Sequence, residues 1–298
     1  MRLQAITADF TTMHYANLAA LAADHKTALK GPVALILVED TTEVGSTVKH
    51  HADLGFANLV LFCPRDFTLP AGMPANVHRV DFDITADDAL QTIVNTVIAA
   101  APTQWLFYCY NAEYLFFPFC EHRAVTEVLT FMSEERRDSV MTYTVDLYAR
   151  DLDQSPDAVN VADAYFDGTG YYALARTDDQ GENLDRQLDI FGGLRWRFEE
   201  HIPKNRQRLN RSSLFRALPN LKMLPDGSLS APEHNTVSCP WHHNLTAATA
   251  SFRTAKALRN NPGSRHAIAN FYALNSVPFT WTSQQLLEIG LIEPGQWF

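Results

Sequence analysis

The sequence predicts an α/β fold built around an open, mainly parallel sheet. Residues 33–38 and 58–63 are continuous apolar runs, which is typical of strands that are buried on both faces of such a sheet. Residues 43–53, between the two runs, have the pattern of a helix, and Gly55 supplies its C-terminal stop. These three segments predict a strand–helix–strand unit, whose crossover is expected to be right-handed.

Further elements are expected on both sides of this unit. In chain order they are a helix over residues 13–29, a short strand over 77–82, a helix over 87–101 capped by Asp83 or Thr85, an aromatic strand within the stretch 105–119, a helix over 124–135 and a strand over 140–148. After residue 150 the periodicity weakens, and Asp, Gly, Asn and Pro become frequent. We therefore expect the chain to divide near residue 150.

The composition argues against several classes of protein. The chain has 298 residues, enough for one large domain or a domain with an added lobe, and its net charge of −10 argues against a general nucleic-acid binder. The first thirty residues lack the pattern of a secretory signal, and no apolar run is long enough to predict a transmembrane helix. The four cysteines are scattered without a CxxC pair, which indicates reduced thiols and a cytoplasmic location.

The aromatic strand contains one charge in an otherwise apolar stretch. Eight of the fifteen residues from 105 to 119 are aromatic, and Glu113 is the only charged residue among them. An isolated dry carboxylate would cost several kcal/mol or become protonated. Glu113 is therefore expected either where the strand opens onto solvent or beside a cation, a metal or a donor-rich ligand. The alternative is a buried structural pair with an arginine.

Polar residues follow three of the predicted strands. Asp40, Asp66 and Asn111 with Glu113 each lie just beyond the carboxyl end of one strand. Ligands of open α/β sheets bind outside these ends. The pattern predicts a binding site at this edge of the sheet.

Residues 191–197 form a second candidate segment. Gly192 and Gly193 permit positive φ or close backbone approach, and Arg195 and Arg197 follow them. If the chain is extended here, both guanidinium groups point to one face, where they suit a diphosphate or a cluster of carboxylates. The alternative is pairing with acidic residues nearby in the sequence. These are Asp189, Glu199 and Glu200.

A histidine cluster lies farther along the chain. His234 and His242 are metal-capable side chains, with Glu233 and His243 beside them. They suggest a metal hydrolase as a distant hypothesis, and loop histidines that bond the backbone are the alternative. No GxSxG elbow, Walker loop or GxGxxG motif follows a predicted strand, so the usual hydrolase, P-loop and dinucleotide hypotheses lack support.

The first strand–helix–strand unit resembles a known family. Residues 38–40, 48–56 and 59–62 are similar to the opening of glycosyltransferase family 2-like proteins, which typically have Lys-Asn-Glu, a helix ending Tyr-His-x-x-Leu-Gly-Phe, and a strand. Asp40 takes the place of the motif's Glu, and His51 that of its His.

Three later segments extend the resemblance. Residues 105–115 resemble the strand with the family's Asp-x-Asp-Glu-Phe-Leu signature, residues 191–197 its Gly-Gly-x-Arg-x-Arg, and residues 251–253 its His-Phe-Lys. The resemblance covers roughly residues 33–260 in the right order. More specifically, it looks like an alphaproteobacterial subgroup of these proteins.

The resemblance implies a GT-A-like fold, with a Rossmann-like mixed sheet flanked by helices. The implied parts are an N-terminal helical extension (residues 1–30), a nucleotide-sugar-binding half (31–150), and an acceptor-side half with C-terminal helices (151–298). The implied reaction transfers a sugar from a nucleotide diphosphate donor to a hydroxyl of a saccharide or lipid-linked acceptor. The C-terminal tail, with Trp281 and the closing Gln-Trp-Phe, is expected to cover the acceptor cleft or to form a contact in a homo-oligomer.

The sequence departs from the family pattern at the metal site. The signature's two aspartates, which hold a divalent ion in the family, fall at Tyr110 and Ala112, and neither can hold a hard cation. Two hypotheses follow. In the first, the chain is a metal-independent transferase in which arginines neutralise the diphosphate, and manganese or magnesium binds weakly or not at all. In the second, the chain is a non-catalytic GT-A-like protein that binds a ligand or partner. Ser251, in place of the motif's histidine, favours the second hypothesis.

The resemblance also implies roles for the candidate residues. Asp40 and Asp66 are expected near the nucleoside, and Glu113 with Asn111 at the donor sugar or metal. The diphosphate is expected beside Arg195 and Arg197, with Gly192 and Gly193. If the reaction inverts, Asp146 or Asp189 is expected to be its general base.

Overall fold

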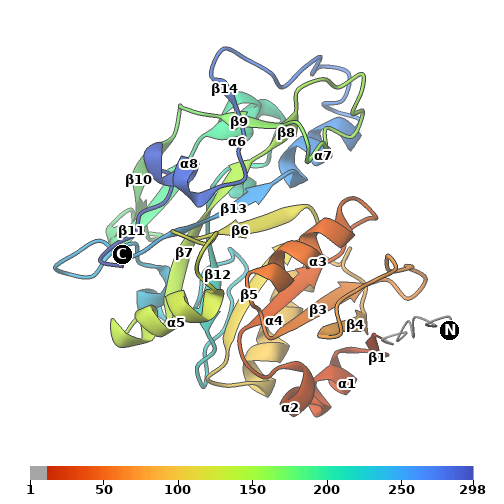
Figure 1. Ribbon diagram of the computed structural model, residues 1–298. Helices are drawn as coiled ribbons and strands as arrows, with labels where there is room; N and C mark the ends of the chain where they lie inside the picture. The colour runs from red at the N-terminus through yellow and green to blue at the C-terminus, as the bar shows by residue number, and fades with distance from the viewer. Residues whose placement is uncertain (1–11, 298) are drawn as a thin grey trace, which may run out of the picture.

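A nine-stranded mixed sheet forms the centre of the protein in the computed structural model, which describes residues 12–297 (Figure 1). In order across the sheet, the strands are β1 (Met13–Tyr15), β4 (Val77–Asp81), β3 (Asn58–Cys63), β2 (Val33–Leu37), β5 (Trp105–Tyr110), β12 (Asn210–Arg216), β7 (Ser139–Asp146), β13 (Ala247–Ser251) and β6 (Glu113–Phe116). The first five are parallel, β12 is antiparallel to both neighbours, β13 is parallel to β7, and β6 is antiparallel to β13. This arrangement confirms the α/β fold and is compatible with a Rossmann-like sheet.

The predicted strand–helix–strand unit lies near the middle of the sheet. β2 and β3 pair in parallel from Val33–Asn58 to Leu37–Phe62, and every residue of β2 is buried. Helix α3 (Val44–Asp53) connects them, and Gly55 follows it with φ of 87°. The apolar runs are continuous because helices cover both faces of these strands.

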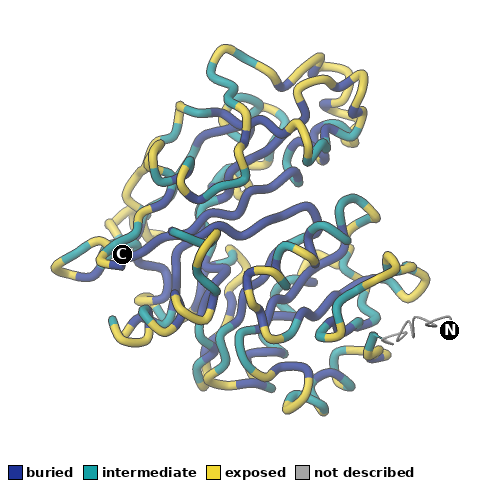
Figure 2. Tube along the Cα trace, in the orientation of Figure 1, coloured by how far each residue is buried: buried dark blue, intermediate teal, exposed yellow. Residues whose placement is uncertain are grey.

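Helices cover the two faces of the sheet as separate layers (Figures 1 and 2). On one face, α3 and α5 (Val125–Glu134) bury apolar side chains against the strands. On the other face, α1 (Leu18–Ala23), α2 (His25–Ala28) and α4 (Ala89–Ala100) do the same. The buried trace in Figure 2 follows the strands between these layers.

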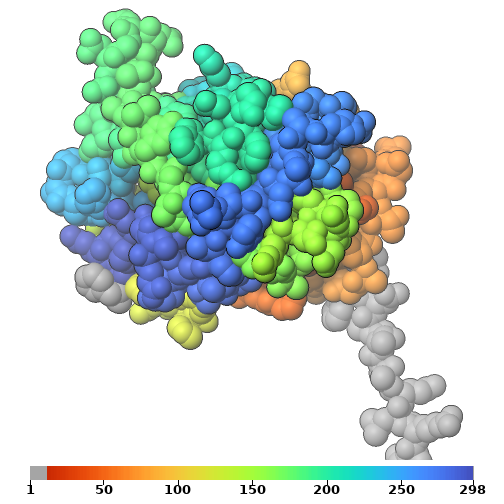
Figure 3. Space-filling view, turned by 90° about the horizontal axis from the view of Figure 1, so that it is seen from above, coloured from red at the N-terminus to blue at the C-terminus, as the bar shows by residue number. Residues whose placement is uncertain are grey.

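The remaining elements follow β7 in the chain. They are a three-stranded sheet of β14 (Ser276–Pro278), β9 (Ala164–Asp167) and β8 (Tyr148–Ala149); a hairpin of β10 (Tyr172–Thr177) and β11 (Asn183–Phe191); helices α6 (Gly193–Arg197), α7 (Arg253–Asn260) and α8 (Ser283–Glu288); and three short 3-10 helices, η1 (Glu199–His201), η2 (Lys204–Arg206) and η3 (Pro232–Asn235). The β10–β11 hairpin forms the green projection in Figure 3. Most of β10 is exposed.

Two predictions near the N-terminal side are wrong. The segment predicted as one helix over residues 13–29 begins with strand β1, which pairs with β4, and continues as α1 and α2. The N-cap of α4 is Asp88, whereas Asp83 accepts hydrogen bonds from the amide and hydroxyl of Thr85. A short polar side chain that bonds two residues ahead forms a turn as readily as a cap, so the sequence could not distinguish them.

The predicted aromatic strand is two strands in different places. β5 ends at Tyr110, Ala112 has a left-handed φ of 59°, and β6 continues at the far edge of the sheet beside β13. Asn111 holds the turn, because it accepts from the amide of Glu39 and donates to Asp40 Oδ1 and to the carbonyl of Thr42. High strand propensity on both sides conceals this break in the sequence.

The sheet draws strands from both sides of residue 150. β12 and β13 come from the expected acceptor-side half, and they lie beside β5, β7 and β6 from the expected nucleotide-sugar half. None of the helices within residues 12–297 is long and apolar enough to cross a membrane.

Candidate functional site

Four carboxylates and four cations gather at the carboxyl edge of the central strands. They form the pairs Glu39–Arg253, Asp40–Lys256, Glu113–Arg211 and Asp146–Arg195. The charges of Glu113, Arg211 and Arg253 all act on Arg195, which places the pairs close together. We refer to these eight residues as the edge network.

Glu113 lies at the buried centre of the edge network. Both terminal nitrogens of Arg211 donate to its carboxylate, at 2.7 and 2.8 Å, while Ser251 Oγ donates at 2.8 Å and the Tyr110 amide at 2.9 Å. The side chain has no exposed surface. Burial raises the pKa of Glu113, but the charge and hydrogen bonds of Arg211 outweigh it and lower the pKa to about 2. The arginine-pair alternative is therefore the one that the structure shows.

Arg211 is the main residue that sequence reasoning missed. It occupies the start of β12, which pairs with β5 only along residues 105–107, so the Glu113–Arg211 pair lies beyond that ladder. The register of β12 against β7 also shifts between Arg211 and Leu214. An arginine at the start of a buried strand was the available indication, but its partner is 98 residues away in the chain.

Acid should destabilise the protein as Glu113 becomes protonated. The pKa of Glu113 is about 2 in the folded protein against an ordinary value of 4.5, so the unfolded chain binds more protons between these values. The contribution of Glu113 to the free energy of unfolding is complete above about pH 4.5 and is lost as pH falls toward about 2. In all it is on the order of 3 kcal/mol. Urea denaturation at about pH 6, 4 and 3 measures it. The Glu113→Gln variant should lose this part of the pH dependence, and an unchanged slope would contradict the assignment.

Two half-buried ion pairs join α7 to the loop after β2. Arg253 donates to both carboxylate oxygens of Glu39, at 2.8 and 2.6 Å, and its guanidinium lies 3.7 Å from the centre of the Tyr110 ring. The Lys256 Nζ lies 2.7 Å from Asp40 Oδ2. In each pair one partner or both retain between a quarter and two fifths of their side-chain exposure. Glu39, Arg253 and Asp40 are therefore partly exposed members of the edge network, whereas Lys256 is buried.

Asp146 ends strand β7 beneath α6. Its carboxylate is buried, and its contact with Arg195 is long, at 3.4 Å from Nε. Burial raises the pKa of Asp146 above its ordinary value, although Arg195, Thr254 and Arg211 oppose this effect. Asp146 therefore retains a proton affinity that a fully paired carboxylate such as Glu113 has lost.

The chain is not extended after Leu194, so the condition for two guanidinium groups on one face is not met. Residues 193–197 form helix α6, so Arg195 and Arg197 do not share a face. Arg195 is held by Asp146 and donates to the carbonyls of Arg206 and Arg208. Arg197 donates to Asp167 Oδ1 at 2.7 Å and to the carbonyl of Phe271 at 2.6 Å. Both arginines connect structural segments, and their partners are not the acidic neighbours expected from the sequence.

The paired glycines have the conformations that the sequence indicated. Gly192 has φ of 147° and Gly193 has φ of 57°. A Cβ atom on Gly192 would lie 2.6 Å from Cδ1 of Tyr171 and 2.9 Å from the carbonyl oxygen of Gly170. Glycine is required here because backbone and ring pack directly against it.

The other candidate residues lie apart from the edge network. Asp66 is exposed after β3, although it shares the carboxyl edge with Asp40. Asp189 lies on the hairpin and pairs with Arg208 at 3.2 Å. His234 is buried, and His242 lies 3.2 Å from Glu135. Within the described residues, no three His, Cys, Asp or Glu side chains are grouped to hold a metal, so the two histidines lack a ligand set.

The residues at the expected metal position do not fit a divalent cation. Tyr110 and Ala112 have no carboxylate, and both oxygens of Glu113 already accept charged or polar hydrogen bonds. Hard cations require several free oxygen ligands.

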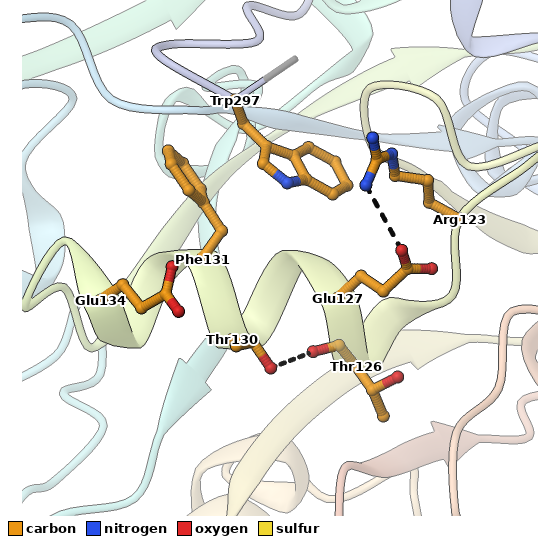
Figure 4. A pocket seen from close by; sticks show the side chains of 7 residues that line it. All are labelled: Arg123, Thr126, Glu127, Thr130, Phe131, Glu134 and Trp297. Atoms are coloured by element: carbon orange, nitrogen blue, oxygen red, sulfur yellow. Dashed lines mark hydrogen bonds and ion pairs between the residues drawn. The ribbon is translucent and has the colours of Figure 1, made fainter.

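The C-terminal tail lies over α5. Trp297 stacks on Phe131 and lies beneath the guanidinium of Arg123, 5.2 Å from its carbon to the ring centre (Figure 4). These residues, with Glu127 and Glu134, line a pocket of about 310 Å³. Trp281 instead packs edge-on against Tyr114 and donates to the carbonyl of Val161.

Comparison with known proteins leaves the family open. No protein-family model matches this sequence, and no curated protein matches it. The glycosyltransferase resemblance therefore stays a prediction, and the structure itself defines an α/β protein with a charged, largely buried network at the carboxyl edge of its sheet.

Proposed function

We propose that this protein is a glycosyltransferase that binds a nucleotide diphosphate sugar at the carboxyl edge of β2 and β5 without a divalent cation. The observation that carries the proposal is the position of Arg253 and Lys256, which face that edge in half-buried pairs with Glu39 and Asp40. The strand order, with antiparallel β12 between β5 and β7, supports a GT-A-like sheet.

In the pairs Glu39–Arg253 and Asp40–Lys256, a phosphate group can replace the carboxylate as the partner of the cation. The carboxylate of Glu39 holds Arg253 through two parallel hydrogen bonds, a geometry that a phosphate group also offers. Lys256 is three residues along the same helix, so the two cations lie on one face of α7. A diphosphate that displaces Glu39 and Asp40 would have both of its phosphate groups neutralised.

Asp146 supplies the general base of the proposed reaction. The acceptor hydroxyl gives its proton to the Asp146 carboxylate as its oxygen bonds the anomeric carbon of the sugar. The bond from that carbon to the diphosphate breaks, and the nucleoside diphosphate leaves with the electron pair. Arg253 and Lys256 stabilise the charge that develops on it. Asp146 fits this role better than Asp189, whose carboxylate lies on the hairpin with Arg208.

Nucleotide titration tests the donor site. UDP and GDP, each with and without manganese, should be followed by thermal unfolding, because a ligand of the folded state raises the melting temperature. We expect a rise with one diphosphate that does not depend on manganese. Arg253→Gln should weaken the diphosphate about 10- to 100-fold, because a charge-assisted hydrogen bond contributes about 1.5–3 kcal/mol, and should leave uridine or guanosine binding unchanged.

The control for Arg253 is Arg265→Gln, which makes the same charge change at an exposed site beyond α7. No thermal shift with either diphosphate would overturn the donor site. A shift that requires manganese would contradict the metal-independent form. Equal weakening by Arg265→Gln would mean that only the net charge matters.

A non-catalytic binding protein is the second candidate. The pairing of Glu113 with Arg211 favours this candidate, because the buried carboxylate at the centre of the edge network is already neutralised. The two functions differ in turnover. A non-catalytic protein should bind the diphosphate and the intact donor sugar, yet release neither sugar nor nucleotide from that donor over hours.

A further inference from the structure

The hairpin of β10 and β11 leaves one of its two strands uncovered. It projects from the body of the protein (Figure 3), and five of the six residues of β10 are exposed, whereas β11 is mostly half-buried. Tyr172 is 44% exposed and Leu174 is 55% exposed. A two-stranded hairpin is at best marginally stable by itself in water, and a further strand stabilises it.

The outer edge of β10 offers its backbone groups to solvent. Among the described residues, β10 pairs only with β11, and no backbone group of residues 172–176 bonds to any other segment. Edge strands usually carry a lysine, a proline or an inward-facing charge that prevents pairing with a second chain. Residues 172–175, Tyr-Ala-Leu-Ala, have none of these, and the one charge of the strand, Arg176, is held by Asp226. This edge can therefore accept another strand.

A second copy of β10 is complementary to this edge. When two such strands run antiparallel about a two-fold axis at Ala173, Tyr172 of each protomer lies opposite Leu174 of the partner subunit. Both side chains are on one face of the hairpin, because they alternate with Ala173 along the strand. The two large exposed apolar side chains of the strand then cover each other twice, and no like charges lie opposite one another.

The charges of the hairpin and of its base are also complementary in this arrangement. The 3-10 helix η2 lies near the base, because the amide of Leu209, three residues after it, donates to the carbonyl of Ile190 in β11. Three exposed acidic residues lie at the tip and two exposed basic residues in η2, namely Asp178, Asp179, Glu182, Lys204 and Arg206. Antiparallel pairing directs the acidic tip of each protomer toward the basic base of the other, which favours association.

We propose that the edge of β10 is a dimerisation site, at which a second copy of this chain adds its own β10 and the two hairpins form one four-stranded antiparallel sheet. The partner is a copy of this chain because self-pairing matches both the apolar side chains and the charges of tip and base. An interface built on one short strand is small, so the dimer should dissociate on dilution.

Sedimentation equilibrium measures the association. Between about 1 and 100 μM, the mass should rise from 33.5 kDa toward twice that value. Leu174→Lys should weaken the association about tenfold or more, because it places a lysine on the edge in both halves of the interface. Its control is Met13→Lys, which adds the same charge at a 48% exposed residue of β1, at the far end of the central sheet, and should associate like the parent. A parent that stays monomeric at about 100 μM, or equal weakening by both variants, overturns the proposal.

Cysteine cross-linking tests the register of the two strands. Opposite residues of antiparallel strands have Cα atoms about 4.5–5.5 Å apart, which a disulfide can span. With copper-phenanthroline and dioxygen as the oxidant, Ala173→Cys should therefore cross-link two protomers. Ala175→Cys, also exposed and on the same face, should not, because its copy lies four residues away along the strand, about 13 Å. The parent protein is the control for the native cysteines. Equal cross-linking of the two variants, or none with Ala173→Cys, overturns the pairing about Ala173.

Discussion

Arg211→Met should destabilise the folded protein by about 3–5 kcal/mol, because it leaves a buried carboxylate without its cation. Glu113 has no exposed surface and receives two of its four hydrogen bonds from Arg211. Without Arg211, burial dominates and the pKa of Glu113 should rise instead of falling. The free energy of unfolding of the variant should therefore fall as pH rises from acid to neutral. In the parent, the contribution of Glu113 changes in the opposite direction. Urea denaturation at both pH values measures the effect.

Two further variants show whether the loss belongs to the pair. Replacing both partners, as Glu113→Gln with Arg211→Met, should restore most of the stability, because no unpaired charge remains. Arg216→Met, on the same strand, breaks a partly exposed pair with Asp138 at 3.5 Å and should cost less than about 1 kcal/mol. Similar losses from Arg211→Met and Arg216→Met would mean that Glu113 does not depend on Arg211.

In the proposed transferase reaction, Asp146→Asn should lower the rate of sugar transfer by about 10²- to 10⁴-fold while the protein stays folded. Asparagine keeps the shape of the side chain but cannot accept the proton of the acceptor hydroxyl. In the parent, the rate should rise with pH through a pKa above the ordinary value for aspartate, since burial raises the pKa of Asp146. This pH dependence should disappear in the variant. Initial rates across pH, with saturating donor, provide the measurement.

Stability and a second variant complete the test of Asp146. Because the pKa of Asp146 is raised in the folded state, the parent loses stability from this group as pH rises from about 3.8 through that raised pKa. Asp146→Asn should remove that loss. Asp189→Asn, which changes the other candidate base, should leave the transfer rate within a few-fold of the parent. An equal fall in rate for both variants would exclude Asp146 as the specific base.

The two strands and the helix between residues 33 and 63 could be predicted because their environment is uniform. β2 and β3 are covered by helices on both faces, so nearly every position must be apolar. The helix between them alternates buried and solvent-facing positions with the helical period. In such segments the local sequence pattern and the tertiary environment favour the same secondary structure.

Predictions failed where a single residue redirects the chain. Ala112 takes a left-handed conformation that alanine seldom adopts, and the strong strand propensity on either side of it predicted one strand in place of β5 and β6. The same limit applies to Gly193–Arg197, which form a five-residue helix that turns the two arginines toward different partners. Local propensity does not determine these positions, since distant contacts compensate for the strain.

By itself, the sequence determined that the protein has an α/β fold, that polar residues gather at the carboxyl ends of its strands, and that Glu113 needs a partner. Only the tertiary structure decided that this partner is Arg211, that Arg253 and Lys256 pair with Glu39 and Asp40, and that Asp146 lies beside Arg195. The physical reason is the range of the interactions. Burial and periodicity can be inferred from the pattern of neighbouring residues in the chain. The partner of a buried charge depends instead on strand order, which brings together residues that are distant in sequence.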